Sequence, residues 1–283
     1  MPETPRTILI TGCSSGIGLC VAQGLKARGH RVFATARRPE DVGMLEKEGF
    51  EAFPLDLTCS TSIQQTVEQV MSATEGRLYA LFNNGAYGQV GAVEDLSRDA
   101  LRAQFETNLF GWHELTCAVL PAMRRQGEGR IIQNSSVLGF VAMAYRGAYN
   151  ASKFALEGLT DTLRLELRGT HIHVSLIEPG PIESRFRANA YLMFKKHIDP
   201  SASPHRAQYK AMEARLAKKG PVVPFTLPPE AVLKRVIHAL ESPRPKARYY
   251  VTFPTYLFGT LKRLLSTRML DRVLLKTSGG GSR

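Results

Sequence analysis

The chain has 283 residues, 43% of them hydrophobic, and this length predicts a sizeable core in one large domain or two small ones. Its four cysteines form no C-x-x-C pair and accompany no His cluster, so we expect reduced thiols in a cytoplasmic protein, with neither a bound metal nor disulfide bonds. The formal net charge of +12 would suit a nucleic-acid binder, but no helix-turn-helix, zinc-finger or aromatic RNA-binding pattern accompanies it.

Short β-branched segments alternate with amphipathic segments along most of the chain. Six strands are expected, at residues 6–11, 31–36, 51–57, 78–84, 129–136 and 172–179. Helices are expected at residues 16–29, 40–49 and 60–75, from about 97 to 125, from the segment holding Tyr149 to about 168, and near 230. This alternation, with nearly continuous apolar strands, is typical of a parallel sheet with helices on both faces. We therefore predict a three-layer, doubly wound α/β (Rossmann) fold in one domain, residues 1–276, with ligands at the carboxyl ends of its strands.

The first strand is followed by the glycine-rich segment TGCSSGIG. Small residues let the backbone approach a pyrophosphate, and the N-terminus of the next helix offers free N–H groups and a partial positive charge. An ordinary strand–helix turn with a Ser cap is the alternative, but the order strand, loop, helix, strand favours nucleotide binding. Cofactor contacts are therefore expected from Gly12, Ser14, Ser15, Gly16, Ile17 and Gly18.

The second strand ends in TARR, where an enzyme that uses NAD would carry an acidic residue for the ribose 2′-hydroxyl. Arg37 and Arg38 can instead pair with a 2′-phosphate. Two solvated arginines at the start of a helix are the alternative interpretation. The position favours NADP over NAD as the cofactor.

The segment GAYNASKFAL places Tyr149 and Lys153 four residues apart, side by side on one helix face. A phenol with its ordinary pKa of about 10 is a poor acid–base catalyst near neutrality, and an adjacent ammonium would lower that pKa. Taken alone, the segment fits a solvated Tyr and Lys on a helix surface better than a catalytic pair.

Taken together, the motifs resemble the short-chain dehydrogenases/reductases over nearly the whole chain. TGCSSGIG matches the family's T-G-x-x-x-G-x-G, YNASK matches Y-x-x-x-K, and NSSV, ETNLFG and IEPGPIES follow at the family's spacing. LITGCSSGIG, VFATARR and a basic extension near residue 185 are similar to the 17β-hydroxysteroid-dehydrogenase-like and retinol-dehydrogenase-like branch. The resemblance implies an NADP(H)-dependent oxidoreductase that interconverts a carbonyl and an alcohol.

The resemblance also implies catalytic roles. Tyr149 would exchange a proton with the substrate oxygen, while Lys153 would lower the pKa of Tyr149 and bind the nicotinamide ribose. Ser136, rather than its neighbour Ser135, would hydrogen-bond the substrate oxygen. Asn108 would hold a water that connects Lys153 to solvent.

Further cofactor contacts are implied where later strands end. We expect them from Asp56, Asn84, Gly85, Ala86, Pro179, Gly180, Ile182 and Ser184, although ordinary turns would explain Asp56 and the Pro-Gly pair as well. Asn83 is expected to tie neighbouring strands together. The chain reads NNGAYG where the family usually reads N-N-A-G, and this exchange of Gly85 and Ala86 leaves the conformation of the loop open.

Residues 185–219 interrupt the core pattern where the family places its substrate lid, and they contain nine Lys or Arg against two acidic residues. Residues 186–194 and 137–145 are largely apolar, which suits a lipophilic carbonyl such as a steroid, a retinoid or a long-chain aldehyde. Packing of the lid onto the body is the alternative role for these side chains. Substrate contacts are expected from Phe140, Met143, Tyr145, Phe186 and Tyr191.

The end of the chain is amphipathic and basic. Residues 255–276 contain two apolar stripes, which we expect to dock on the domain or on a second subunit, with peripheral membrane contact as the alternative. No apolar run is long enough to span a membrane, and no signal peptide is expected. Residues 277–283 are expected to be a flexible tail, and the partners a small-molecule substrate and further copies of the chain, as a dimer or tetramer.

Two other classes of function compete with the oxidoreductase. A nucleotide-binding sensor or scaffold without turnover usually lacks the Tyr or the Lys, and this chain has both. A nucleotide-sugar epimerase or dehydratase generally has a longer chain and a G-x-x-G-x-x-G loop, which is absent here.

Overall fold

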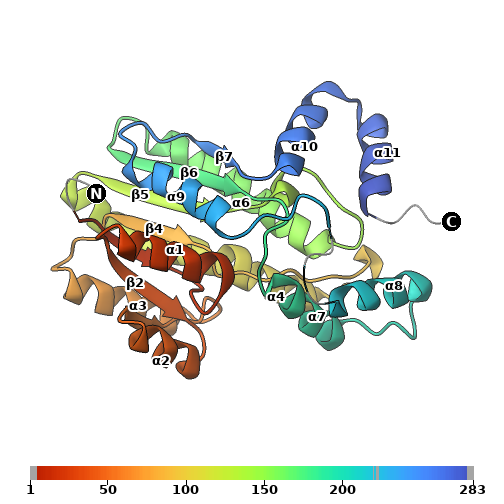
Figure 1. Cartoon of the computed structure of the whole chain (residues 1–283), viewed down its shortest axis with the longest axis horizontal. Helices are drawn as coiled ribbons and strands as arrows, with labels where there is room; N and C mark the ends of the chain where they lie inside the picture. Colours follow the sequence, from red (N-terminus) through yellow and green to blue (C-terminus); the bar gives the residue numbers. More distant parts are fainter. Residues whose placement is uncertain (1–4, 219, 221–222, 279–283) are drawn as a thin grey trace.

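The computed structural model describes residues 5–218, 220 and 223–278. In this part of the chain seven parallel strands form one twisted sheet with helices on both faces (Figure 1), in the order β3-β2-β1-β4-β5-β6-β7. The strands are β1 (Thr7–Ile10), β2 (Arg31–Ala36), β3 (Glu51–Pro54), β4 (Ala80–Asn83), β5 (Gly129–Asn134), β6 (Ile172–Glu178) and β7 (Arg248–Tyr250). The predicted three-layer, doubly wound fold is confirmed.

Eleven α-helices lie in the described residues. They are α1 (Gly16–Ala27), α2 (Pro39–Lys47), α3 (Ser60–Ala73), α4 (Arg98–Phe105), α5 (Gly111–Gln126), α6 (Gly147–Glu166), α7 (Phe186–His197), α8 (Arg206–Ala217), α9 (Glu230–Glu241), α10 (Phe253–Leu264) and α11 (Thr267–Ser278). Short turns of helix cover Val93–Asp95 and Val137–Gly139, and a π-helical turn, Glu106–Phe110, joins α4 to α5. The long helical region expected from about 97 to 125 is present and contains this π-helical turn, whereas β7 was not expected at all.

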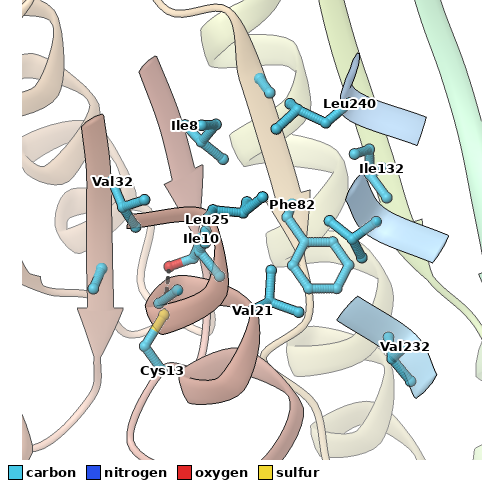
Figure 2. Close-up of a cluster of buried hydrophobic side chains, with 14 of the residues drawn as sticks. Ile8, Ile10, Cys13, Val21, Leu25, Val32, Phe82, Ile132, Val232 and Leu240 are labelled. Atoms are coloured by element: carbon cyan, nitrogen blue, oxygen red, sulfur yellow. Dashed lines mark hydrogen bonds between the residues drawn. The ribbon is translucent and has the colours of Figure 1, made fainter. Parts of the chain in front are cut away.

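The core follows from the alternation of side chains along β1. Ile8 and Ile10 point to one face of the sheet, where they pack against Val21 and Leu25 of α1 and against α9 (Figure 2). Leu9 points to the opposite face, into a cluster formed mainly with α3, α5 and α6. Because each fully buried Ile or Leu stabilises the fold by roughly 1.5–3 kcal/mol, this three-residue alternation fixes which helices cover which face.

Two smaller apolar clusters lie beside the carboxyl end of the sheet. Helices α7 and α8 fold over each other around Phe194 and Tyr209, so the segment expected to be a lid is helical. Helices α10 and α11 place Phe258 and Leu274 against the loop that follows β5. The apolar stripes of the tail thus dock on their own domain, which is one of the two roles expected for them.

The tail helix extends further than expected. Helix α11 continues through Ser278, so the first two residues of the expected flexible tail are helical, and residues 279–283 lie outside the described part. Leu264, the last residue of α10, remains 75% exposed. Among the described residues, no helix combines the length and apolar character that a membrane span needs.

Candidate active site

The sheet order reverses between β1 and β4, and the glycine-rich loop leaves β1 at this point. Gly12 has a φ of +72°, which disfavours any side chain. Gly18 lies so close to this turn that an added Cβ would be 2.1 Å from the carbonyl oxygen of Gly12. The first turn of α1 therefore packs directly against the loop, and its N-terminus faces the cleft as the sequence predicted.

The loop after β4 crosses the glycine-rich loop at close range. A Cβ on Gly12 would lie 2.6 Å from the Cα of Gly85. The hydroxyl of Thr11 accepts the N–H groups of Asn84 and Gly85, both at 2.8 Å, and Trp112 Nε1 donates to the Gly85 carbonyl at 2.9 Å. Glycine at position 85 thus stands where the two backbones touch, which accommodates the exchange with Ala86.

The expected role of Asn83 was wrong. Its side-chain amide donates to Thr116 of helix α5, at 3.0 Å. The neighbouring Asn84 ties the strands instead, because its Nδ2 donates to the carbonyl oxygen of Thr11 at 3.0 Å and its Oδ1 accepts from Asn134 Nδ2 at 2.8 Å. Asn84 thereby joins the ends of β1, β4 and β5, which meet at the cleft.

A cavity of about 680 Å³ opens at this switch point. Of the residues predicted to contact the cofactor, its walls contain Gly12, Ser14, Ser15, Arg37, Arg38, Asp56, Gly85 and Ala86. Other predicted contacts do not line this cavity: Gly16, Ile17, Gly18, Asn84, Pro179, Gly180, Ile182 and Ser184. The walls also contain cationic and aromatic residues that the sequence did not suggest: Tyr87, Arg102, Arg185 and Lys196.

The Pro-Gly loop after β6 lies at the other end of the cleft. The Pro179 carbonyl accepts the N–H of Val137, at 2.8 Å, so the loop is fixed to the segment that carries Ser136. A Cβ on Gly180 would lie 2.3 Å from the hydroxyl of Thr252. The loop is therefore clamped between the serine segment and the start of α10.

Tyr149, Lys153 and Ser136 converge at this end of the cleft, as predicted. All three side chains are buried, and the Ser136 hydroxyl lies close enough to the Tyr149 phenol to lower its pKa. Lys153 Nζ donates to the carbonyl oxygen of Asn134 at 2.8 Å and lies 4.1 Å from the ring centroid of Trp112. The same nitrogen lies 5.9 Å from the centroid of the Tyr149 ring, so the ammonium sits beneath the phenol.

Burial dominates the ionisation of this group. Desolvation raises the pKa of Tyr149 to about 12, and the nearby Ser136 hydroxyl acts in the opposite direction. Desolvation lowers the pKa of Lys153 to about 7, while the carboxylate of Glu157, one turn along α6, raises it. The Tyr149 pKa is therefore raised by the low polarity around the phenol, and the predicted lowering by Lys153 is not found in this arrangement.

Asn108 lies in the π-helical turn that joins the end of α4 directly to the start of α5. Its Oδ1 accepts from the Tyr87 N–H at 3.2 Å, and its Nδ2 donates to the Tyr87 carbonyl oxygen at 2.9 Å and to Ser152 Oγ at 3.4 Å. π-Helical turns inside α-helices occur frequently at functional sites. Here the turn directs the amide toward α6, one residue before Lys153.

Behind Lys153 lies a charged network that the sequence analysis missed. Arg248 of β7 donates to the carboxylates of Glu157, Glu178 and Asp161. Glu157 also accepts from Ser135, next to Ser136. Arg248 is 87 residues from Asp161 and 91 residues from Glu157 in the sequence, so no local pattern predicts these contacts. The network anchors the serine segment and α6 to the last strand.

The expected substrate residues divide between two places. Phe140 and Met143 pack in the cluster that contains Tyr149, and the Phe186 ring lies edge-on to the Tyr149 ring with centroids 5.3 Å apart. Tyr145 and Tyr191 pack in the cluster of the α7–α8 segment instead. Tyr145 also lines a second cavity, of about 520 Å³, together with Glu94 and His205.

A dinucleotide cleft that ends at a buried phenol is the arrangement of an oxidoreductase that exchanges a hydride with a nicotinamide. The chain belongs to the short-chain dehydrogenase family, since the family model described as "short chain dehydrogenase" matches residues 6–193. The protein is accordingly an NAD(P)-dependent oxidoreductase that interconverts carbonyl and alcohol groups.

Curated relatives agree with this family. "Uncharacterized oxidoreductase YbbO" of Escherichia coli K12 is 43% identical over 269 residues, which cover 95% of this chain and 94% of that protein. "Retinol dehydrogenase 8" of Homo sapiens is 33% identical and covers 95% and 89%. "17-beta-hydroxysteroid dehydrogenase type 1" of Homo sapiens is 34% identical and covers 87% and 77%.

Solved structures share the fold. A short-chain dehydrogenase from Streptomyces avermitilis is 29% identical with a TM-score of 0.77, covering 99% of this chain and 100% of that one. At 24% identity, a dehydrogenase from Burkholderia phymatum in complex with NAD has a TM-score of 0.76, with coverage of 93% and 94%. Both similarities show that the chain shares this fold.

Proposed function

We propose that the protein is an NADP(H)-dependent carbonyl reductase or alcohol dehydrogenase for a lipophilic substrate, with Tyr149 as the proton donor and acceptor. The observation that carries the proposal is the shared burial of Ser136 and Tyr149, above Lys153, at the end of a cleft lined by Arg37 and Arg38. The relation to a retinol dehydrogenase and a 17β-hydroxysteroid dehydrogenase supports the branch expected from the sequence.

The proposed chemistry needs few groups. When bound, the nicotinamide supplies or accepts the hydride. Tyr149, with its pKa raised to about 12, is protonated near neutrality and so can donate a proton to the substrate oxygen. Ser136 hydrogen-bonds that oxygen and stabilises the charge that develops on it. The protonated form of Lys153 supplies positive charge under the phenol, and Asn108 fixes the backbone of Tyr87.

The preference for NADP rests on Arg37 and Arg38. Both line the cavity, and neither side chain has a hydrogen bond or ion pair within the described residues. An arginine pairs with a phosphate through charge-assisted hydrogen bonds worth about 1.5–3 kcal/mol each, less where water and salt have access. We expect NADPH to bind roughly 10- to 100-fold more tightly than NADH, since each 1.4 kcal/mol is about tenfold.

The proposed substrate class rests on the surroundings of Tyr149. Phe140, Met143 and Phe186 surround it on one side, and Phe258 and Leu274 extend the same apolar cluster from the tail. Apolar walls with few polar groups suit a steroid, a retinoid or a long-chain aldehyde. The homo-oligomer and the cytoplasmic location stay predictions.

The test of cofactor choice is Arg37→Asp, titrated with NADPH and NADH at one fixed salt concentration. The carboxylate repels the 2′-phosphate and can accept from a free ribose hydroxyl, so the preference should reverse. Equal affinities in the wild type, or an unchanged ratio in the variant, would contradict the NADP assignment. A panel of aldehydes, ketones and steroids, followed by loss of NADPH absorbance, tests turnover. Tight cofactor binding with no turnover would favour a sensor or scaffold.

A further inference from the structure

One face of helix α7 forms a wall of the nucleotide cavity. Its residues in the wall are spaced four, three, one and three apart, which is a single helical stripe: Arg185 at its start, then Asn189, Leu192, Met193 and Lys196. None of Ser136, Tyr149 and Lys153 lines this cavity, whereas Arg37 and Arg38 do. Part of the segment expected to cover the substrate therefore faces the phosphate and adenosine half of the cleft.

The two ends of this stripe lie at different parts of the cleft. Ser184 approaches the glycine-rich loop so closely that a Cβ on Gly16 would be 3.0 Å from its own Cβ, which places Arg185 beside the loop. Lys196 follows eleven residues later, about 16 Å along a helix that rises 1.5 Å per residue. It lies toward α4, whose Asp99 interacts electrostatically with the adjacent His197. Figure 1 shows α7 beside α4.

The cations of the cavity lack partners within the described residues. Five line its walls without any side-chain hydrogen bond or ion pair there: Arg37, Arg38, Arg102, Arg185 and Lys196. The walls also contain four carboxylates: Asp41, Asp56, Asp99 and Glu106. The Asp56 carboxylate already accepts two hydrogen bonds from Thr58.

The neighbours of these cations on the same segment behave differently. Arg187 donates to the backbone carbonyls of Lys218 and Gly220, and Lys195 lies over the ring of Tyr191, 4.7 Å from its centroid. Arg185 and Lys196 are thus the two cations of α7 and its N-cap that are left free to meet a ligand in the cavity.

We propose that α7 is a second phosphate-binding wall, in which Arg185 binds the pyrophosphate of the cofactor and Lys196 binds the 2′-phosphate opposite Arg37 and Arg38. The inference rests on the proposed NADP(H) function and extends it, because the 2′-phosphate is then bound from the sheet and from the lid. Since one ligand joins both walls, the cofactor holds α7 against the cleft before substrate binds.

The test measures dissociation constants for NADP⁺, NAD⁺, 2′,5′-ADP and ADP. Binding is followed by quenching of the fluorescence of Trp112, the single tryptophan of the chain, whose indole N–H donates a hydrogen bond to the carbonyl oxygen of Gly85 in the loop after β4. Lys196→Ala should weaken the binding of NADP⁺ and 2′,5′-ADP roughly 5- to 20-fold, which is the value of one exposed charge-assisted contact. The affinities for NAD⁺ and ADP should stay within about twofold of the wild type. Arg185→Ala should weaken NADP⁺ and NAD⁺ by the same factor. Lys195→Ala is the matched control and should change none of the four.

Two results overturn the inference. Unchanged NADP⁺ affinity in Lys196→Ala excludes the contact, and equal weakening of NADP⁺ and NAD⁺ shows that Lys196 does not recognise the 2′-phosphate. Arg37→Asp separates this failure from failure of the proposed function. If Arg37→Asp loses the NADP⁺ preference and Lys196→Ala keeps it, the proposed cofactor stands and the α7 contact is wrong. If the wild type binds NADP⁺ and NAD⁺ equally, both are wrong.

Discussion

Replacement of Arg248 by Met should destabilise the protein in a pH-dependent way. Arg248 is the shared cation of Glu157 and Glu178, which are 7% and 0% exposed. Met fills a similar volume but leaves both carboxyl groups buried without a positive partner. Removing one member of a buried ion pair costs about 3–5 kcal/mol, and because Arg248 is itself partly exposed we expect about 3 kcal/mol at pH 8.5. The half-exposed Asp161 adds little.

The sign of the pH effect follows from the two carboxyl groups. Burial raises the pKa of Glu178 from 4.5 to about 8 and also raises the pKa of Glu157. A carboxyl group whose pKa is higher in the folded state contributes most stability below its unfolded pKa and loses it as the pH rises through the folded pKa. Without Arg248 both pKa values rise further, so the variant should lose about 1–3 kcal/mol less at pH 5.5 than at pH 8.5.

Urea unfolding followed by Trp112 fluorescence at the two pH values measures this difference. Arg31→Met removes the exposed pair with Glu51 and is the control, with an expected change below about 1 kcal/mol at either pH. Adding Glu178→Gln to Arg248→Met should restore part of the loss, because one buried charge is removed. A loss below about 1 kcal/mol at pH 8.5, or one that is equal at both pH values, would refute the reasoning.

Gly18→Ala should weaken the binding of NADP⁺ and NAD⁺ at least tenfold, because a Cβ at this position would lie 2.1 Å from the Gly12 carbonyl oxygen. Gly43 has open space around it, so Gly43→Ala should leave both affinities unchanged in the same titration. Lys153→Met should stabilise the protein at pH 6 by about 1–2 kcal/mol, because burial lowers the pKa of Lys153 to about 7 and the folded state binds that proton more weakly than the unfolded chain. The gain should shrink as the pH rises from 7 to 10.5, and a gain that grows over this range in urea unfolding would contradict the burial argument.

The sequence predicted what depends on local pattern. The glycine spacing, the arginines after β2 and the Tyr–Lys pair are each set within a few residues. The structure brings the first two to one cavity and buries the Tyr–Lys pair together outside its walls. The strand β7 escaped prediction because three residues show no periodicity. The π-helical turn escaped prediction because it changes the register of an otherwise continuous helical pattern, and neither Pro nor Gly lies within Glu106–Phe110 to mark it.

Long-range contacts were beyond the sequence. Arg248 reaches Glu178 from another strand, and the tail packs on the loop after β5, through pairings that only the folded topology creates. Asn83 and Asn84 carry the same side chain at adjacent positions of a strand end. Because successive side chains on a strand point to opposite faces, only one of the two can tie the strands, and only the structure shows which. The spacing of the stripe on α7 can be read from the sequence, but only the structure shows that the stripe faces the nucleotide cavity.

Single-turnover reduction by Tyr149→Phe tests the central claim most directly. The variant is mixed with an accepted aldehyde and NADPH, and the loss of NADPH is followed alongside a separate measurement of NADPH affinity. The phenol is the proposed proton donor, so the rate should fall by about 10²–10⁴-fold while NADPH binds within a few fold of the wild type. A rate within tenfold of the wild type, with binding intact, would contradict the account.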